Sequence, residues 1–424
     1  MTLYVVKFGG SSLATPALIL QAAEKIQELQ KQGNQIVVVV SAMGSQTNDF
    51  LALTKNFSED ADNASTDCVL AAGEQVTCGL MALALQSLNL GAQTFLGWQV
   101  PILTSQAAGQ ARIESIDPAN LKECLAQNKI PVIAGFQGIS AEGKITTLGR
   151  GGSDLTAVAL AGVLQADQCI FFKDVDGLLS ADPRIVKDAH LLPEVTYDEM
   201  LELSSLGAKV LNARAVEMAH THEVPLHIRP TFGHGQGTQI IGDRTIAEGE
   251  SITGIVSNEQ ESKFCLTKCP VSAAVTAEIF QLLSEHHITV DMIIQNGLLE
   301  GQDTDDLTFT IPRDQTLKAQ QLLKKAQHTL GFEDLLISQR IAKISLVGIG
   351  IRGHAGVAQR VFKTLADHGL NVHGISTSEI KLSILISADY AAKAVDLLHH
   401  EFLPQKDLPN ESTTTSPISL AAGL

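Results

Sequence analysis

Residues 147–156 read Thr-Leu-Gly-Arg-Gly-Gly-Ser-Asp-Leu-Thr and join a tight glycine turn to an apolar helical pattern. The glycines let the backbone turn with its N–H groups pointing inward, and Arg150 adds a fixed positive charge. A turn of this kind at a helix N-terminus favours an anion. The stretch therefore predicts an anion-binding turn; the alternative is an ordinary turn whose helix is capped by Ser153 or Asp154.

On both sides of this turn, strand-like and helical patterns alternate as far as about residue 230. The aliphatic runs typical of strands occupy 3–8, 36–41, 130–134, 169–172 and 226–228. Between the first two runs, the pattern predicts a helix that starts at Thr15-Pro16 and ends at Gly33-Asn34. The alternation predicts an α/β fold, an αβα sandwich around a largely parallel sheet.

The second half of the chain is organised differently. Residues 264–294 and 344–375 repeat the order strand, helix, strand, and each copy continues with an alternating strand and a short helical pattern. Two βαββαβ units are therefore expected after a glycine-rich linker at 232–250. The predicted domains are 1–245, 250–340 and 341–403, with 250–262 able to pair into the last domain and 404–424 forming a disordered tail.

The composition limits the classes of function. The chain has 424 residues, enough for two or three domains, and its formal net charge of −16 argues against binding to nucleic acid or an anionic membrane. The longest aliphatic run, 36–40, is too short to cross a bilayer, so a cytoplasmic protein is expected. Six cysteines without a complete zinc-binding pattern are expected to be reduced core thiols.

The first strand ends in Lys7-Phe8-Gly9-Gly10-Ser11-Ser12, just before the first helix. The two glycines let a phosphate approach the main chain, and Lys7 can neutralise it. The order differs from the P-loop, in which the lysine follows the glycines, and from the dinucleotide fingerprint. A phosphate-binding turn is one interpretation, and an ordinary strand-to-helix turn with a solvated lysine is the other.

A third candidate loop follows the strand at 169–172. It contains Lys173-Asp174-Val175-Asp176-Gly177 and then Ser180-Ala181-Asp182-Pro183-Arg184. Because ligands gather at the carboxyl ends of strands in open α/β sheets, the three loops can converge on one cleft. The acidic residues could hold Mg²⁺ or a ribose, or could simply form an Asp-Gly turn. Lys209 is either a further ligand or a solvated charge.

Six motifs, in this order, resemble those of the aspartate kinases of the amino acid kinase family. They are Lys-Phe-Gly-Gly-Ser-Ser from residue 7, Ser-Ala-Met-Gly from 41, Ala-Gly-Glu from 72, Thr-Leu-Gly-Arg-Gly-Gly-Ser-Asp from 147, Asp-Val-Asp-Gly from 174 with Ala-Asp-Pro-Arg from 181, and Leu-Gly-Ala-Lys-Val-Leu from 206. The resemblance covers residues 2 to about 403. It implies an amino acid kinase fold followed by two ACT-like domains, as in the monofunctional, feedback-inhibited enzymes.

The resemblance implies transfer of the γ-phosphoryl group of ATP, with Mg²⁺, to the β-carboxylate of L-aspartate, giving 4-phospho-L-aspartate for lysine, threonine and methionine synthesis. A carboxylate is already ionised at pH 7, so the reaction needs suppressed charge repulsion and in-line positioning rather than a general base. By the same resemblance Lys7, Arg150 and Asp154 are catalytic. Glu74 and Asp154 are expected to receive the substrate ammonium, and Arg150 is expected to bind its carboxylate.

The remaining site residues are carried over motif by motif. The expected substrate contacts are Thr47, Glu74, Arg150, Gly151, Gly152, Ser153 and Asp154. The expected nucleotide contacts are Lys7, Phe8, Gly9, Gly10, Ser11, Ser41, Lys173, Asp174, Ser180, Ala181, Asp182, Pro183, Arg184 and Lys209. Lys173 departs from the serine or threonine usual there, so it could contact a phosphate or point into solvent.

The resemblance also implies inhibition by lysine, threonine or both, bound between paired ACT-like units, and a homo-oligomer formed through those units. The expected effector contacts are Asp291, Met292, Ile293, Gln295, Asn371, Val372, Ser376, Thr377, Ser378 and Glu379, which are otherwise ordinary strand and turn residues. Asp291 could accept the effector ammonium.

A competing hypothesis is a regulatory subunit without catalysis, which would be expected to lack one of the catalytic residues. Since no room for a fused dehydrogenase domain follows residue 403, a monofunctional enzyme is expected.

Overall fold

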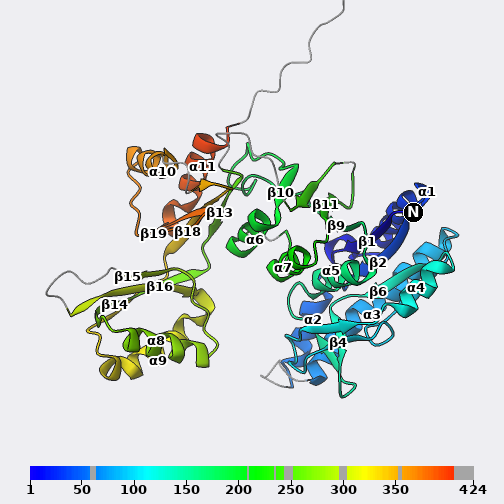
Figure 1. The fold of residues 1–424 in the computed structure, drawn as a ribbon, viewed down its shortest axis with the longest axis horizontal. Coiled ribbons are helices and arrows are strands. Elements are labelled where there is room, and N and C mark those ends of the chain that lie inside the picture. Colours follow the sequence, from blue (N-terminus) through cyan, green and yellow to red (C-terminus); the bar gives the residue numbers. More distant parts are fainter. Residues whose placement is uncertain are drawn as a thin grey trace, which may run out of the picture.

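The computed structural model describes residues 1–57, 64–207, 210–233, 235–242, 252–295, 303–351 and 356–404. Its elements form a large α/β domain and two smaller α/β units, which lie on opposite sides of Figure 1. The expected tail lies outside the described residues from residue 405 onward.

An eight-stranded sheet forms the middle of the large domain. In spatial order its strands are β10 (Glu194–Thr196), β12 (Thr238–Ile241), β11 (Leu226–Pro230), β9 (Gln168–Lys173), β1 (Leu3–Phe8), β2 (Gln35–Val40), β6 (Ile130–Ala134) and β3 (Ala92–Phe95). Every neighbouring pair is parallel except β11 and β12. This confirms the largely parallel sheet.

Helices cover both faces of the sheet, because successive side chains of a buried strand point to opposite sides. In β1, Val5 belongs to one hydrophobic core and Val6 to the other. One face carries α1 (Pro16–Lys31) and α3 (Ala64–Ser87), with α2 (Gln46–Thr54) beside α3. The other face carries α4 (Ala119–Ala126), α5 (Gly152–Leu164), α6 (Tyr197–Leu206) and α7 (Ala213–Thr221).

Two of these helices bear on the sequence predictions. In α1, the Thr15 side chain accepts a hydrogen bond from the amide of Leu18 at 3.3 Å and Pro16 opens the helix, as predicted. The 24-residue α3 is the one helix of the described residues that is long and apolar enough to cross a membrane. Half of its most apolar window is buried inside the protein. All six cysteines are free, but two are not in the core: Cys68, on α3, is exposed, and Cys265 is half-buried.

A second, four-stranded sheet in the large domain is absent from the sequence prediction. Its order is β5 (Ile113–Ile116), β4 (Ile102–Thr104), β7 (Gln137–Ser140) and β8 (Ile145–Thr147). Strands of three or four residues are too short to show a clear alternating pattern. The last of them, β8, leads directly into the glycine turn at 148–152, so this sheet helps to position the candidate site.

The two C-terminal units each have a four-stranded sheet and two helices. The first contains β14 (Glu261–Pro270), α8 (Ala273–Glu285), β15 (Ile293–Gln295), β16 (Thr304–Pro312), α9 (Thr316–Leu330) and β17 (Leu335–Ser338). The second contains β18 (Ile341–Val347), α10 (Gly356–Asp367), β19 (Gly374–Thr377), β20 (Lys381–Ser387) and α11 (Ala391–Phe402). Its fourth strand is β13 (Gly254–Asn258), which precedes the first unit in the chain and pairs antiparallel with β18. Figure 1 shows the two units stacked on one side of the large domain.

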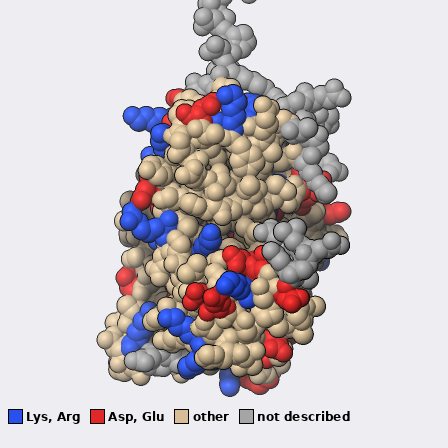
Figure 2. Space-filling model, turned by 90° about the vertical axis from the view of Figure 1, so that its left-hand side faces the viewer, with Lys and Arg blue, Asp and Glu red and all other residues tan. Residues whose placement is uncertain are grey.

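The second unit packs against the large domain. Ala181 and Val186, from the loop after β9, belong to the same hydrophobic core as Ile255, Ile344 and Leu398 of that unit. On the face formed by the two units, acidic and basic side chains are interspersed around a broad uncharged area (Figure 2). The loop after β9 is therefore shared between two domains.

Candidate active site

The carboxyl ends of four parallel strands meet at one edge of the large sheet. Lys7 of β1 is in register with Val39 of β2 and with Phe171 of β9. Beyond the strands, the amide of Ser41 donates to Phe8 O at 3.3 Å, and the amide of Gly135 donates to Val40 O at 3.0 Å. The loops after β1, β2, β6 and β9 therefore gather at the edge where ligands bind in open α/β sheets.

A carboxylate between two lysines forms the centre of this edge. Asp154 Oδ1 lies 2.5 Å from Lys7 Nζ, and Asp154 Oδ2 lies 3.5 Å from Lys173 Nζ. The side chains of Lys7 and Asp154 are only 6% and 7% exposed, and that of Lys173 is 16% exposed. Asp154 comes from α5, so the cluster connects three elements. We call these three residues the lysine–aspartate cluster.

Burial and charge together set the protonation of the cluster. Burial acts to raise the pKa of Asp154, but Lys173 and Lys7 outweigh it and hold that pKa below its ordinary value. Burial lowers the pKa of Lys173 to about 8, although Asp154 opposes the shift. With one carboxylate and two lysines, the cluster has a formal net charge of +1.

This arrangement changes the expected role of Asp154. Its carboxylate already has two ammonium partners, so a third, from a substrate, would find it neutralised. Its side chain does not cap α5 either, because the N-cap is Gly151 and no side-chain hydrogen bond caps the helix. Of the two interpretations of the glycine turn, the capping one does not describe the structure.

Glu74 is a second buried carboxylate, on α3. It is 3% exposed, and its Oε1 accepts a hydrogen bond from the amide of Ala42 at 3.0 Å. Among the described residues its Oε2 has no hydrogen-bond partner. Burial raises the pKa of Glu74 to about 7, against the opposing effects of the Ala42 amide and the Lys7 charge. An unpaired buried carboxylate oxygen is costly unless a ligand satisfies it.

The glycine turn requires glycine at two positions. Gly149 and Gly151 have φ of +78° and +74°, a region that side chains disfavour, and a Cβ at Gly151 would lie 2.5 Å from the Asn212 side chain. Gly152 and Ser153 follow in the buried first turn of α5. Arg150, between the two glycines, is exposed, and within the described residues its guanidinium has no ion-pair partner. It is thus available to an anion.

Three residues that the sequence analysis missed hold this turn. The Asp67 carboxylate accepts from Gly109 N at 3.0 Å, from Thr147 N at 3.0 Å and from the Thr147 hydroxyl at 2.6 Å. Asn212 Nδ2 donates to Arg150 O at 2.9 Å, and Arg214 Nη1 donates to Leu148 O at 2.8 Å. Asp67 could have been found, because it lies seven residues before Glu74, on the same face of a helix.

The turn after β1 approaches the loop after β2 closely. A Cβ on Gly10 would lie 2.8 Å from Ala42 O, and Gly10 O accepts from the amide of Gly44 at 2.9 Å. Phe8 is buried and stacks on Phe172 with ring centroids 4.8 Å apart, so its side chain supports the sheet. Gly9 directs its amide to Phe172 O at 3.5 Å. Ser11 is exposed at the start of the turn, and Ser41 is half-buried.

Two further expected contacts lie on α2 and in the loop after β9. Thr47 is half-buried in the first turn of α2, and α2 packs on α3. Asp174 is exposed directly after Lys173. The described residues contain no group of three or more His, Cys, Asp and Glu side chains that could hold a metal ion by themselves. Lys209 lies outside the described residues.

The loop at 180–184 has two parts with different surroundings. Asp182 and Arg184 form an ion pair of 2.6 Å near the surface, next to the exposed Pro183. This hydrogen bonding holds the pKa of Asp182 below its ordinary value. Ser180 and Ala181 are buried against the second C-terminal unit, and the Ser180 hydroxyl lies 2.8 Å from His399 Nε2. The predicted nucleotide contact by the Ser180 side chain therefore does not fit the structure, because that hydroxyl already has a partner.

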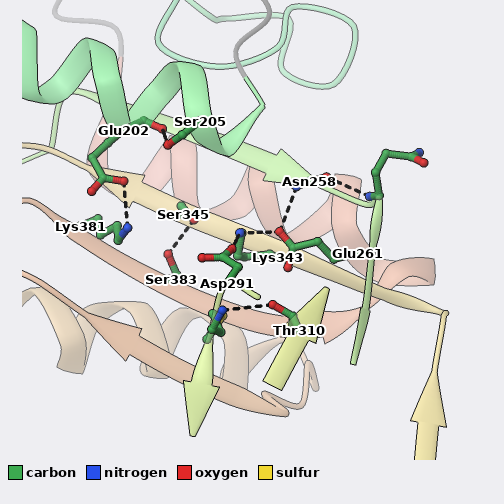
Figure 3. Close-up of polar contacts among 12 residues, drawn as sticks. Glu202, Ser205, Asn258, Glu261, Asp291, Thr310, Lys343, Ser345, Lys381 and Ser383 are labelled. Atoms are coloured by element: carbon green, nitrogen blue, oxygen red, sulfur yellow. Dashed lines mark hydrogen bonds and ion pairs between the residues drawn. The ribbon is translucent and has the colours of Figure 1, made fainter. Parts of the chain in front are cut away.

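The residues expected to bind an effector fall into two groups. Asp291 forms an ion pair with the buried Lys343, which also lies 2.5 Å from Glu261 (Figure 3). Met292 packs on Ile341 and Leu385 of the other unit. Ile293 and Gln295 are exposed on β15, an edge strand. Asp291 thus already has an internal ammonium partner, which the sequence analysis did not anticipate.

The second group lies on the second unit. Thr377 and Glu379 are exposed and Ser376 and Ser378 are half-buried, on β19 and the turn that follows it, and Asn371 and Val372 precede the strand. The turn ends at Lys381, whose Nζ lies 2.9 Å from Glu202 Oε2 on α6 of the large domain (Figure 3). This ion pair joins the expected effector segment directly to the large domain.

Comparison with known proteins identifies the class. A profile of the amino acid kinase family matches residues 2–230, and an ACT-domain profile matches residues 344–402. The aspartokinase of Pseudomonas aeruginosa is 42% identical over 404 residues, which make up 95% of this chain and 98% of that protein. The crystal structure of aspartate kinase from Synechocystis is 36% identical, with a TM-score of 0.53, and the match covers 95% of this chain and 69% of that one.

A more distant relative has a very similar fold. E. coli aspartokinase III is 23% identical, with a TM-score of 0.79 in its R-state complex with aspartate and ADP and of 0.72 in its T-state complex with lysine and aspartate. The matches cover 94% and 95% of this chain and 99% of that chain. The chain belongs to the amino acid kinase family. Within that family it is an aspartate kinase, with an ACT domain at its C-terminal end.

Proposed function

We propose that this enzyme transfers the γ-phosphoryl group of ATP to the β-carboxylate of L-aspartate, giving 4-phospho-L-aspartate for lysine, threonine and methionine synthesis in the cytoplasm. The observation that carries the proposal is that two buried sites, each containing a carboxylate, lie at one sheet edge. One is the lysine–aspartate cluster, with its net positive charge, and the other is Glu74, whose Oε2 is unpaired. The cluster can bind a polyanion such as a triphosphate, and Glu74 can bind an ammonium group.

Glu74 and Arg150 complement the two ends of an amino acid. The unpaired Oε2 of Glu74 accepts the α-ammonium of aspartate, because a buried carboxylate gains most from a cationic partner. Arg150, exposed and unpaired among the described residues, binds a substrate carboxylate with its planar fork. Asn212 and Arg214 hold the turn that carries Arg150, and Ser153, Gly151 and Gly152 line its helical end. Thr47 is a further substrate contact.

Lys7 and Lys173 bind the phosphate oxygens, and Asp154 holds both ammonium groups in place. Phosphoryl transfer to a carboxylate brings two anions together, so preorganised positive charge is the main requirement. The cluster supplies two ammonium groups on rigid strand ends, restrained by a single carboxylate. Fixed charges of this kind need no reorganisation as charge moves toward the transferred group. Gly9 and Gly10 allow the phosphates to approach the main chain.

Mg²⁺ would be held mainly by the phosphates of ATP, with Asp174 as the nearest exposed carboxylate in the chain after Lys173. The ion neutralises phosphate charge when it is bound. Asp182, Pro183, Arg184 and Lys209 complete the nucleotide side. Ser180 and Ala181 contribute by supporting that loop from behind.

Lysine, threonine or both inhibit the enzyme by binding between ACT-like units of a homo-oligomer. The E. coli enzyme in complex with lysine supports this assignment by fold similarity. The contact of Lys381 with Glu202 gives a route to the large domain. Because Lys343 already pairs with Asp291, an effector ammonium at Asp291 would have to compete with an internal one.

A comparison of acceptors tests the proposed recognition of aspartate. ADP formation is measured with L-aspartate, with N-acetyl-L-aspartate, which lacks the ammonium, and with L-glutamate. We expect turnover with L-aspartate alone, because Glu74 requires an ammonium and the Arg150 turn fixes the distance between the two ends. Equal turnover with N-acetyl-L-aspartate would show that Glu74 does not bind the ammonium.

A further inference from the structure

The loop after β9 belongs to the large domain by sequence and to the second C-terminal unit by packing. Ala181 and Val186 are buried, 5% and 0% exposed, in the hydrophobic core of that unit. Asp182 lies between them and carries its carboxylate to the surface, where it pairs with Arg184. The position of this acidic tip is therefore fixed by contacts made on both sides of it.

Ser180 is the polar anchor of the loop. Its hydroxyl lies 2.8 Å from His399 Nε2 on α11 and accepts a hydrogen bond from the amide of His190 at 3.0 Å. Its amide donates to His190 O at 2.9 Å, and its carbonyl accepts from the amide of Ile255 at 2.8 Å. All the polar atoms of Ser180, which is fully buried, are thus bonded, and two of the partners come from the C-terminal unit.

His399 is a buried ring with a polar partner at one nitrogen. It is 1% exposed, and among the described residues its Nδ1 has no hydrogen-bond partner. The ring of His190 lies 5.9 Å away and that of His400 lies 6.3 Å away. Burial and these two histidines lower the pKa of His399, while Asp396 and Asp188 act the other way. Ser180, at Nε2, is therefore the one hydrogen-bond partner of this ring among the described residues.

We propose that His399 is a positioning residue for the nucleotide. Through Ser180, it fixes the loop whose exposed tip, Asp182 to Arg184, contacts ATP in the proposed function, on which this inference rests. A side chain of the C-terminal unit thereby holds the nucleotide-binding loop in place from behind. The aspartate side, built from Glu74 and the Arg150 turn, does not share this anchor.

Calorimetric titration of the full chain with ADP and Mg²⁺, and separately with L-aspartate, tests this role. His399→Leu replaces the ring with an apolar side chain of similar size, which fills the buried space but cannot form the hydrogen bond. We expect it to weaken ADP binding roughly threefold to tenfold, the effect of one lost hydrogen bond, and to leave aspartate binding unchanged. His399→Gln, which keeps a polar nitrogen near the position of Nε2, should restore most of the ADP affinity.

Two further variants keep the test decisive. Ser180→Ala removes the other half of the contact and also the hydrogen bond from the His190 amide, so it should weaken ADP binding at least as much as His399→Leu. The double variant should be no worse than Ser180→Ala alone. Lys393→Gln, on the same helix but exposed, is the control and should bind ADP normally. ADP affinity within twofold of the wild type in both His399→Leu and Ser180→Ala would overturn the inference. ADP binding is measured directly and does not depend on turnover. If the wild type bound ADP but did not phosphorylate aspartate, the proposed function would be refuted, while the ADP affinities of the variants would still test the role of His399.

Discussion

Lys7 Nζ lies 2.5 Å from Asp154 Oδ1, and both side chains are almost completely buried. A buried pair of this kind gains little net stability, since the desolvation of both ions offsets their attraction. Here the carboxylate also contacts Lys173, so the site keeps an excess positive charge at the edge where phosphates are expected. The three residues are therefore best explained by the net positive charge that they present together.

Replacing Lys7 should reduce catalysis more than stability. In Lys7→Met the apolar stem is kept and Asp154 retains Lys173 as a partner, so the fold is preserved. We expect kcat to fall about 100-fold to 1000-fold, the usual effect of removing one preorganised charge from a transition state. Steady-state kinetics and thermal unfolding check this, with Lys31→Met, an exposed lysine, as the control. A kcat within threefold of the wild type would refute the role of Lys7.

Arg150→Ala should mainly weaken the binding of aspartate. The side chain is exposed and has no ion-pair partner among the described residues, so its loss should leave stability unchanged. We expect the KM for aspartate to rise about 10-fold to 100-fold, as for a lost charged hydrogen bond, with the KM for ATP unchanged. Arg112→Ala is a matched exposed control. If only the KM for ATP rose, the two sides of the cleft would be reversed.

The pKa of Glu74, raised to about 7 by burial, predicts how activity depends on pH. Below this pKa the carboxyl group is protonated and cannot pair with the substrate ammonium. With ATP saturating, kcat/KM for aspartate should therefore rise about fivefold from pH 6 to pH 7, a range that lies below the pKa of about 8 of Lys173. Glu74→Gln should have a low kcat/KM that no longer changes over this range, whereas Glu24→Gln, at an exposed site, should behave like the wild type. A flat wild-type profile would contradict the assignment.

The ion pair between Lys381 and Glu202 predicts a variant with altered feedback. Lys381→Met breaks the direct contact between the expected effector segment and α6 without touching the active site. We expect the concentration of lysine or threonine needed for half-inhibition to rise at least about fivefold, since coupling free energies are typically 1 to 3 kcal/mol. Basal kcat should stay near the wild-type value, as in the exposed control Lys393→Met. Unchanged inhibition would show that the signal travels by another route.

Elements with strong local signals could be predicted from the sequence. The strands at 3–8 and 130–134 have the predicted bounds, because each is a largely apolar run that ends at a glycine. The second strand expected within 264–294 covers only 293–295, since the preceding residues leave α8 in a turn with a positive φ at His287. The sheet of β4, β5, β7 and β8 was missed, because its strands are too short to show periodicity.

The sequence predicted which residues belong to the site, but not which of them contact one another. The sequence identified Lys7, Lys173 and Asp154 separately, while their contacts depend on the register of β1 with β9 and on the position of α5. Ser180 shows the same limit. Its motif marks it as a nucleotide contact, and only the folded structure shows that its hydroxyl is bonded to His399, 219 residues later in the chain. Long-range partners of this kind leave no trace in local spacing.

Identification of the reaction product tests the central proposal most directly. The enzyme is incubated with ATP, Mg²⁺ and L-aspartate, and the acyl phosphate is trapped with hydroxylamine and analysed by mass spectrometry and NMR. We predict that the β-hydroxamate of aspartate forms in an amount equal to the ADP released, and that none forms without ATP. ADP release without any aspartyl hydroxamate, or a hydroxamate at the α-carboxyl group, would contradict the account.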